Sequence, residues 1–350
     1  MATRSFEIAG RPIGGDNPPY LIAEMSGNHN QDLARALSIV DAAKAAGADA
    51  VKLQTYTADT ITIRSHRPEF RIEGGLWANR TLHDLYQEAY TPWDWHGAIF
   101  EHAREIGIVA FSTPFDFTAV DFLESLGAPC YKIASPEIVD LPLIERCAAT
   151  GKPMIMSTGM ATLPEIEEAV AAARGAGCRD LALLYCVSGY PTPVAEMNLA
   201  TMADMARRFD AVIGLSDHST GTAVPVAAVA LGAHLIEKHF TLARADGGVD
   251  SAFSLEPAEF RAMVEASHAA RAAVGAPDYE ISESEARTLP FRRSLYVVGA
   301  VAAGEPLTEA NTRSIRPANG LAPKHYRAVL GRKARQAIAA GTPLDWSLIE

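Results

Sequence analysis

The segment AVIGLSDHSTGTAVPVAAVALGAHLIEKH (residues 211–239) decides the expected fold of this chain. Its two ends, AVIGLSDH (211–218) and LIEKH (235–239), are apolar runs that finish in polar residues. Continuously apolar strands are typical of parallel sheets covered on both faces. A helix is expected to begin near Val224 and to end at Gly232, because glycine is favoured just beyond a helix C-terminus. The segment therefore predicts a strand, a helix and a second strand parallel to the first.

The same alternation of apolar runs and amphipathic helices precedes this segment. The earlier runs are PYLIAE (19–24), AVKLQ (50–54), GIVAFSTP (107–114), CYKIAS (130–135), PMIMS (153–157) and LALLYCVS (181–188). Helices are expected from Gln31 and near Trp93, Phe117, Pro142, Pro164, Met202 and Pro257. Eight such units in about 260 residues predict an α/β fold of the (β/α)8 TIM-barrel type. A doubly wound open sheet is the alternative, although no GxGxxG or P-loop motif follows any run.

Composition limits the class of protein. The 350 residues carry a formal charge of −11 and are 48% hydrophobic, which suits a soluble globular chain with a sizeable core. An acidic balance without a basic cluster argues against nucleic acid as a partner. No run approaches the roughly 18 residues of a membrane span, and MATRSFEIAGRPIGG (1–15) lacks a signal peptide's apolar core. The four cysteines have no metal-binding spacing, so we expect reduced thiols in a cytoplasmic protein.

Two segments depart from the barrel pattern. The connection from Tyr56 to the helix near Trp93 is long and rich in aromatic residues, which favours an ordered lid or substrate wall at the barrel mouth. After YEISESEARTLP (279–290), the chain has short strands, AAGEPL and AAGTPL turns and little helix. We therefore expect a barrel domain over 1–277, a linker over 278–290 and a small, mostly-β domain over 291–350. At this size a core is marginal, so packing against the barrel or another subunit is expected.

Polar residues at the ends of the runs predict an active site, since TIM-barrel sites are built from the C-terminal ends of the strands. Residues i and i+2 of a strand share a face, so Glu237 lies with His239 and Ser216 with His218. Two imidazoles on neighbouring strands can bind one divalent ion and leave positions for water and substrate. The alternative is that each histidine is a hydrogen-bonded core residue. The run GIVAFSTP, with Ser112, offers nothing distinctive.

Two lysines, Lys52 and Lys132, lie inside apolar runs, where an unpaired charge is costly. Each therefore needs an anionic partner. Other runs end in or near the hydroxyl groups of Ser135, Ser157, Ser188 and Ser216. Together these groups would form a cradle for a phosphate or carboxylate. A Schiff-base lysine, as in barrel aldolases without a metal, and a structural ion pair are the alternatives.

The remaining polar candidates are Glu24, Gln54 and Glu237, which are expected to project into the site. A buried carboxylate near a metal can act as a general acid or base. Asp250, in DGGVDSAFS (246–254), follows the last strand and could receive a sugar hydroxyl. A surface turn aspartate is the alternative there.

These residues lie in segments that resemble the sialic acid synthases. The segments are AEMSGNHNQDL (23–33), DAVKLQTY (49–56), YKIASPEI (131–138), MSTGMAT (156–162), CVSGYPTP (186–193), GLSDHSTG (214–221) and IEKHFTL (236–242). Members of that family condense phosphoenolpyruvate with an N-acetylated sugar to give a nonulosonic acid and phosphate. The C-terminal segment resembles their antifreeze-like (SAF) domain.

The resemblance implies roles for individual residues. It implies a divalent ion, Mn²⁺ or Mg²⁺, held by His218 and His239. The implied phosphoenolpyruvate site comprises Lys52, Lys132, Ser135, Ser157, Ser188 and Ser216, although the family more often has asparagine where Ser188 stands. The implied sugar contacts are Glu24, Gln54, Tyr190 and Asp250, with Arg316 of SIRPANG (314–320) reaching into a partner subunit's site. The chain would then be a domain-swapped homodimer, in which Lys52 and Lys132 stabilise charge and Glu24 or Glu237 moves protons.

Two further segments resemble the branch of the family that makes pseudaminic acid. They are FRIEGGLWANRTLHDLYQEAYTPWDWH (70–96) and GGVDSAFSLEP (247–257). The other branches usually have histidine directly after the aspartate of the second segment, where this chain has Ser251. The implied sugar is 2,4-diacetamido-2,4,6-trideoxy-altrose. Synthesis of N-acetylneuraminate or legionaminic acid is the alternative.

Overall fold

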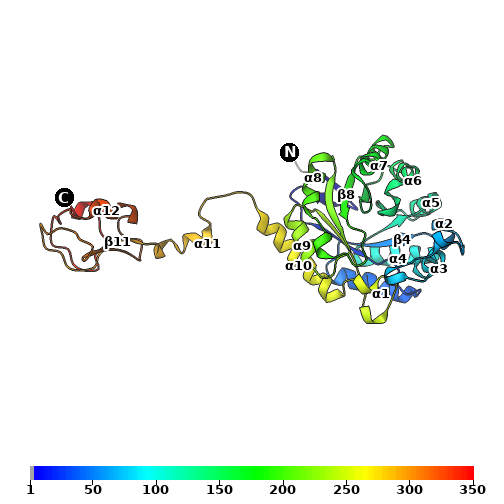
Figure 1. The fold of residues 1–350 in the computed structure, drawn as a ribbon, viewed down its shortest axis with the longest axis horizontal. Coiled ribbons are helices and arrows are strands. Elements are labelled where there is room, and N and C mark those ends of the chain that lie inside the picture. Colours follow the sequence, from blue (N-terminus) through cyan, green and yellow to red (C-terminus); the bar gives the residue numbers. More distant parts are fainter. Residues whose placement is uncertain (1–3) are drawn as a thin grey trace. The chain divides into compact units, whose positions relative to one another are not determined.

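The structure, a computed structural model, describes residues 4–350 (Figure 1). Residues 1–3 lie outside this range. They belong to the N-terminal segment (1–15) that lacks a signal peptide's apolar core and to the expected barrel domain. The chain divides into two compact units, of which one ends at Gly275 and the other begins at Ala276.

A closed barrel of eight parallel strands forms the first unit, as the sequence predicts. The strands follow one another around the barrel in chain order, and the last pairs with the first. They are β3 (Tyr20–Glu24), β4 (Ala50–Thr55), β5 (Val109–Pro114), β6 (Tyr131–Ile133), β7 (Met154–Ser157), β8 (Leu181–Cys186), β9 (Val212–Asp217) and β10 (Leu235–His239). Each of the eight apolar runs therefore contains one strand, and the doubly wound alternative is wrong.

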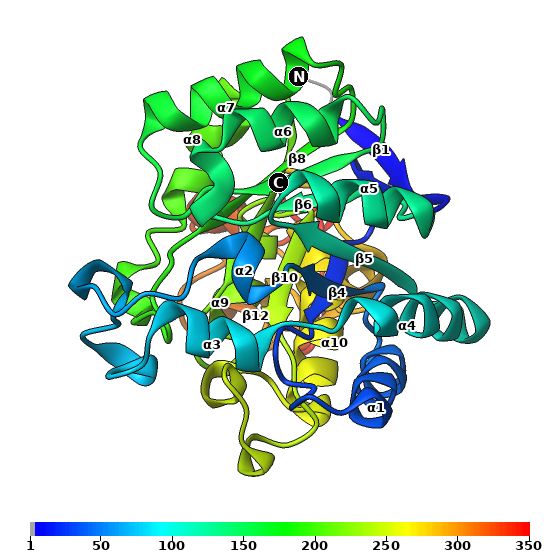
Figure 2. The same ribbon diagram turned by 90° about the vertical axis from the view of Figure 1, so that its right-hand side faces the viewer.

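Helices surround these strands (Figure 2). They are α1 (Leu33–Ala45), α4 (Trp93–Ile106), α5 (Phe117–Ser125), α6 (Leu141–Ala148), α7 (Leu163–Gly175), α8 (Ala200–Arg208), α9 (Ala223–Ala230) and α10 (Pro257–Val274). Most begin within two residues of the predicted position. The helix expected from Gln31 begins at Leu33, because the Asp32 carboxylate caps it by accepting the N–H groups of Ala34 and Arg35.

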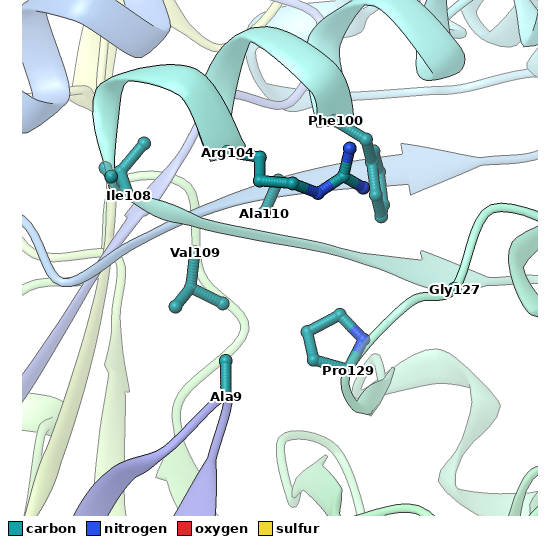
Figure 3. Close-up of a pocket in the computed structure, with 9 residues that line it drawn as sticks. Ala9, Phe100, Arg104, Ile108, Val109, Ala110, Gly127 and Pro129 are labelled. Atoms are coloured by element: carbon teal, nitrogen blue, oxygen red, sulfur yellow. The ribbon is translucent and has the colours of Figure 1, made fainter.

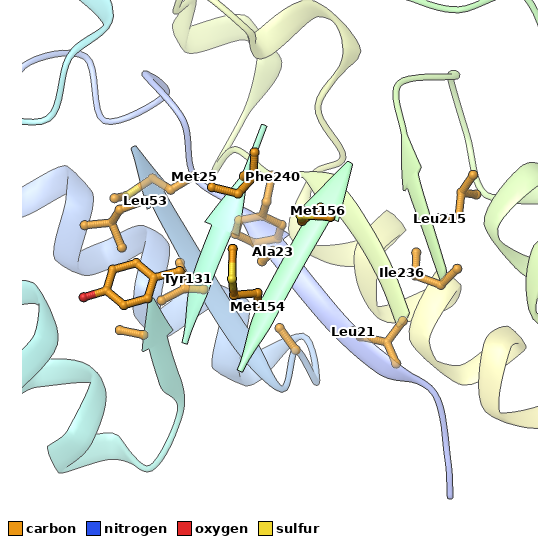
Figure 4. Close-up of a cluster of buried hydrophobic side chains, with 14 of the residues drawn as sticks. Leu21, Ala23, Met25, Leu53, Tyr131, Met154, Met156, Leu215, Ile236 and Phe240 are labelled. Atoms are coloured by element: carbon orange, nitrogen blue, oxygen red, sulfur yellow. The ribbon is translucent and has the colours of Figure 1, made fainter. Parts of the chain in front are cut away.

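Because successive side chains of each strand point alternately outward and inward, the buried apolar residues form two separate layers. Outward-facing side chains such as Leu21, Met156 and Ile236 pack between the barrel and its helices (Figure 4). Inward-facing side chains near the N-terminal strand ends, such as Tyr20 and Leu235, fill the lower barrel. The inward positions become polar only towards the C-terminal ends, which confines the polar cluster to one end of the barrel.

A hairpin that the sequence analysis missed contributes to the lower layer. Strands β1 (Ser5–Ile8) and β2 (Arg11–Gly14) pair antiparallel. Their side chains Phe6, Ile8 and Ile13 are buried in the cluster that fills the lower barrel. The N-terminal end of the barrel is thereby covered with apolar side chains.

The long connection after β4 is ordered. It contains α2 (Ala58–Ile61) and α3 (Leu82–Ala89), which are capped by Thr57 and Thr81. Its Trp77 donates its indole N–H to the carbonyl of Val249, 2.8 Å away, in the loop that follows β10. This contact ties the segment expected to be a lid to the loops at the C-terminal end of the barrel.

The second unit is small and contains short antiparallel strands, β11 (Ser294–Val297) and β12 (Thr312–Ile315), with the short helices α11 (Glu283–Ala286) and α12 (Tyr326–Val329). Gly304 and Gly341 have positive φ angles in the two predicted turns. Nine buried apolar residues, Leu295 and Val297 among them, form a core within this unit. Within residues 4–350, neither unit contains a helix that is long and apolar enough to cross a membrane.

Candidate active site

The polar residues predicted from the strand ends converge inside the C-terminal end of the barrel. Lys52, Lys132 and Glu237 are all at least 95% buried, and they come from β4, β6 and β10. Lys52 pairs with Glu24 at 2.5 Å and lies 3.9 Å from Glu237. Lys132 lies 3.8 Å from Glu237. The expectation that each buried lysine has an anionic partner is confirmed.

Neutral polar groups complete this cluster. The Lys132 ammonium donates to the Ser157 hydroxyl at 2.6 Å, and Gln54 donates to the Glu24 carboxylate at 3.2 Å. The Ser216 hydroxyl donates a hydrogen bond to the Glu237 carboxylate at 3.1 Å. The cluster therefore joins six of the eight strands: β3, β4, β6, β7, β9 and β10.

Burial and charge separate the two glutamates. Burial raises the pKa of Glu24 to about 7, although Lys52 opposes the shift. Burial would also raise the pKa of Glu237, but Lys132 and Lys52 outweigh it and hold that pKa below its usual value. Near neutral pH, Glu24 can thus gain or lose a proton, whereas Glu237 stays ionised.

The two lysines also differ. Burial lowers the pKa of Lys132, because Glu237 compensates only in part. Burial acts in the same direction on Lys52, but Glu237 and Glu24 together raise its pKa above the usual value. Lys132 is therefore the less strongly paired cation of the two.

The predicted metal ligands lie together, with the ring centroids of His218 and His239 5.3 Å apart. His218 donates from Nδ1 to the carbonyl of Val187 at 3.2 Å, so Nε2 is the atom with which this ring could bind a metal ion. His239 Nδ1 is buried and makes no hydrogen bond within residues 4–350. Burial and the neighbouring His218 lower the pKa of His239 well below its usual value, so this ring is neutral. Neighbours, Cys186 first, raise the pKa of His218 against the effect of burial, so the two rings differ. The buried, unsatisfied nitrogen of His239 is a donor of the type that a divalent ion takes from histidine.

The protein supplies few ligands to that position. Asp250 Oδ2 lies 3.9 Å from His239 Nδ1 and accepts a hydrogen bond from Ser26. Over residues 4–350, no group of three or more histidine, cysteine or acidic side chains has the arrangement of a complete metal site. Two imidazoles would therefore leave most coordination positions to water or substrate.

A glycine that the sequence analysis did not identify lies between two of the predicted serines. The N–H of Gly159 donates to Ser135 Oγ at 3.1 Å. A Cβ atom on Gly159 would lie 2.2 Å from Ser188 Oγ and 2.7 Å from Ser135 Oγ. Only glycine allows this approach. We call the two hydroxyls and this part of the backbone the Gly159 cradle; hydroxyl groups gathered in this way are donors that an anion can use.

Two other polar residues were missed. Thr113, rather than Ser112, faces the barrel interior and lies 3.3 Å from Lys52. Ser112 faces outward and hydrogen-bonds Thr55. Glu137, in the turn after β6, has a buried carboxylate oxygen without a hydrogen-bond partner in the described chain, and burial raises its pKa to about 7.

The predicted sugar contacts are distributed over both units. Tyr190 lies beside His218, with ring centroids 4.4 Å apart. The Asp250 side chain is only 13% exposed, so it is not a surface turn residue. Arg316 is an exposed residue of the second unit, and no hydrogen bond or ion pair holds its side chain within residues 4–350.

A cavity of about 390 Å³ lies elsewhere, at the start of β5 (Figure 3). Its walls include Phe100, Ile108 and Val109, and Arg104 is its one charged residue. None of the lysine, glutamate, histidine and serine side chains of the candidate site lines this cavity. The chemistry of the barrel is therefore concentrated at the opposite ends of the strands.

Fold and site together define a TIM-barrel enzyme whose C-terminal strand ends carry a buried cluster of lysine, glutamate and serine side chains beside a histidine pair. The model of the NeuB family matches residues 39–279, and that of the SAF domain matches residues 292–350. The chain belongs to the NeuB family, and a SAF domain follows its barrel.

Individual relatives extend over nearly the whole chain. The pseudaminic acid synthase of Helicobacter pylori is 45% identical over 95% of this chain and 98% of its own length. That of Campylobacter jejuni serotype O:23/36 is 43% identical over 95% and 97%. The solved sialic acid synthetase of Leptospira borgpetersenii has a TM-score of 0.73 and is 32% identical, covering 82% of this chain and 95% of that one. The chain is thus more similar to the two pseudaminic acid synthases than to this sialic acid synthetase.

Proposed function

We propose that this chain condenses phosphoenolpyruvate with 2,4-diacetamido-2,4,6-trideoxy-altrose and water to give pseudaminic acid and phosphate. The observation that carries the proposal is the buried group of Lys52, Lys132 and the Gly159 cradle, which lies at the same barrel end as the histidine pair. Similarity to two pseudaminic acid synthases favours this sugar over that of the sialic acid synthases.

Phosphoenolpyruvate carries two anionic groups, and the site offers donors for both. Ser135, Ser188 and the adjoining Gly159 form one set, and Lys132 with Ser157 forms another. When the negatively charged substrate binds, the ion pair between Lys52 and Glu24 weakens and Lys52 contacts the substrate. Preorganised donors in a water-excluded site stabilise the charge that develops in the transition state.

The reaction forms one carbon–carbon bond and breaks one carbon–oxygen bond. The methylene carbon of the enol attacks the open-chain aldehyde carbon, whose oxygen takes up a proton. Water adds to the central carbon of phosphoenolpyruvate, forming a new carbon–oxygen bond, and loses one proton to give a tetrahedral intermediate. The hydroxyl of this intermediate loses its proton as phosphate departs with the bridging oxygen, which leaves the keto group of the product. Glu24 is the candidate for proton transfer, because its pKa of about 7 permits both states, whereas Glu237 remains ionised and balances the lysines.

His218 and His239 would hold a divalent ion, Mn²⁺ or Mg²⁺, which when bound polarises the aldehyde oxygen. We assign the sugar's polar groups to Gln54, Asp250 and Tyr190, and its N-acetyl group to Arg316 of a second copy in a domain-swapped homodimer. The exposed, unpaired state of Arg316 supports that role. Four free, buried cysteines support a reducing compartment, the cytoplasm.

Phosphate release by the full-length protein tests this function. We expect release from phosphoenolpyruvate and the 6-deoxy diacetamido altrose with Mn²⁺, and loss of release with chelator. N-Acetylmannosamine should be a poor substitute. Release with N-acetylmannosamine alone would assign the chain to sialic acid synthesis. A product without phosphate release, trapped by borohydride on Lys52 or Lys132, would replace the proposal by a Schiff-base aldolase.

A further inference from the structure

An aromatic wall lies on one side of the histidine pair. Tyr190 lies 4.4 Å from His218 between ring centroids, and Phe253 lies 4.8 Å from His239. Tyr190 and Phe253 are themselves 5.3 Å apart. Trp77, from the long connection after β4, extends the wall by packing 5.5 Å from Tyr190. We call Trp77, Tyr190 and Phe253 the aromatic wall.

Polar side chains of the candidate site approach the same histidines from the ends of β3 and β4. Around the barrel, β8 and β9 flank β10 on one side and β3 and β4 on the other. Tyr190 follows β8, whereas Glu24 and Gln54 belong to β3 and β4. The position beside the histidines is thus bordered by the polar groups Glu24 and Gln54 and by the aromatic wall, whose Trp77 and Phe253 come from the connections after β4 and β10.

Ser251, the residue that distinguishes the pseudaminic acid branch in sequence, does not face this position. Its hydroxyl donates to the carbonyl of Gly248 at 3.1 Å, within its own turn. Its side chain therefore offers no free donor to a sugar. A direct contact that selects the sugar would therefore come from another residue near the histidine pair.

We infer that the aromatic wall selects the 6-deoxy sugar, with Trp77 as the specificity-determining residue that contacts the C6 methyl group. The inference rests on the proposed function. The aldehyde carbon of the open-chain sugar must lie beside the histidines and lysines, and C6 is five bonds further along the chain. Its methyl group gains by leaving water against an aromatic face, whereas a 6-hydroxyl there would lose its hydrogen bonds to water.

Trp77 suits this role because its position is fixed. Its indole N–H is held by the carbonyl of Val249, and its ring packs on Tyr190. The donor is thus used by the protein, and the ring presents only its apolar surface. An apolar wall rejects an added hydroxyl weakly, by about 10²-fold at most.

Two sugars that differ only at C6 test the inference. They are 2,4-diacetamido-2,4,6-trideoxy-altrose and the 2,4-diacetamido-2,4-dideoxy-altrose that retains the 6-hydroxyl. The wild-type protein should prefer the 6-deoxy sugar by about 10- to 100-fold in kcat/KM. Trp77→Gln should reduce this preference to within about threefold of unity, mainly by losing activity on the 6-deoxy sugar. The KM for phosphoenolpyruvate should not change.

Trp77→Phe is the matched control, because it keeps an apolar ring and removes the hydrogen bond to Val249. It should retain most of the preference. If Trp77→Phe loses as much preference as Trp77→Gln, the hydrogen bond of the loop is responsible and the wall is not. A wild-type protein that uses both sugars equally, or a Trp77→Gln variant that keeps the full preference, would also overturn the inference. Phosphate release with neither sugar would instead refute the proposed function itself.

Discussion

Two buried lysine–carboxylate pairs lie on opposite faces of the same barrel wall. Lys52 and Glu24 pair at 2.5 Å inside the barrel, and Lys238 and Asp217 pair at 2.5 Å on its outer face. Both pairs are almost completely buried. Their surroundings differ in how fully the charges are satisfied.

The outer pair is closed. Lys238 also donates to the carbonyl of Ser219, and the second oxygen of Asp217 accepts the N–H of Ser219 at 2.9 Å. Inside the barrel, the carboxylate oxygen Glu237 Oε2 has no hydrogen-bond partner among residues 4–350. The comparison teaches that burial of an ion pair alone does not indicate function. What separates the two is a charged oxygen: both oxygens of Asp217 are hydrogen-bonded, whereas Glu237 Oε2 is not.

The largest expected effect follows from breaking the closed pair. Lys238→Met leaves the Asp217 carboxylate buried without its cation, which typically costs about 3–5 kcal/mol of folding free energy. Urea unfolding followed by circular dichroism measures the loss. Replacing both residues, as in Lys238→Met with Asp217→Leu, should recover most of it, because an apolar pair of similar volume is often as stable as the ions. A single variant as stable as the wild type would show that Asp217 is protonated or hydrated there.

Removing a cation from the cluster inside the barrel should instead lower activity and leave the folding free energy almost unchanged. Lys132→Met removes a cation whose partner, Glu237, retains Lys52 and Ser216. We expect kcat/KM for phosphoenolpyruvate to fall by about 10²–10³-fold, the usual cost of losing one transition-state donor. Unfolding free energy should stay within about 1 kcal/mol of the wild type or rise, since a weakly paired buried charge is lost. A stability loss as large as that of Lys238→Met, with activity retained, would make the inner group structural as well.

Sequence alone predicted the barrel because its signal is repeated. Each of the eight strands lies in a continuous apolar run, and each run ends within two residues of the end of the observed strand. The rule that alternate residues share a face also placed Ser216 and Glu237 correctly, and they are hydrogen-bonded across β9 and β10. The hairpin of β1 and β2 was missed because its four-residue strands are too short for a periodic pattern.

The parts of the site that were missed depend on three-dimensional detail. Ser112 and Thr113 are adjacent, and only the phase of β5 decides which one meets Lys52. Counting two residues on from the apolar Phe111 would have favoured Thr113. Gly159 has no side chain to attract notice, and its role comes from the approach of two serines from other strands. Residues on two neighbouring loops, such as Trp77 and Tyr190, cannot be paired from spacing in the sequence.

The smallest expected effect concerns Glu137, in the turn after β6, whose Oε2 is buried without a hydrogen-bond partner in the described chain. Burial raises its pKa to about 7, with Lys132 opposing the shift, so the folded protein binds this proton more tightly than the unfolded chain does. Its contribution to stability is therefore complete below about pH 4.5 and is lost as the pH rises through 7. Since one pKa unit corresponds to about 1.4 kcal/mol and the side chain is partly exposed, the wild type should lose about 1–2 kcal/mol more than Glu137→Gln between pH 5 and pH 8. Glu145→Gln, on the exposed face of α6, should keep the wild-type slope. Parallel stability curves for the wild type and Glu137→Gln would mean that Glu137 is ionised throughout and is paired with a lysine in solution.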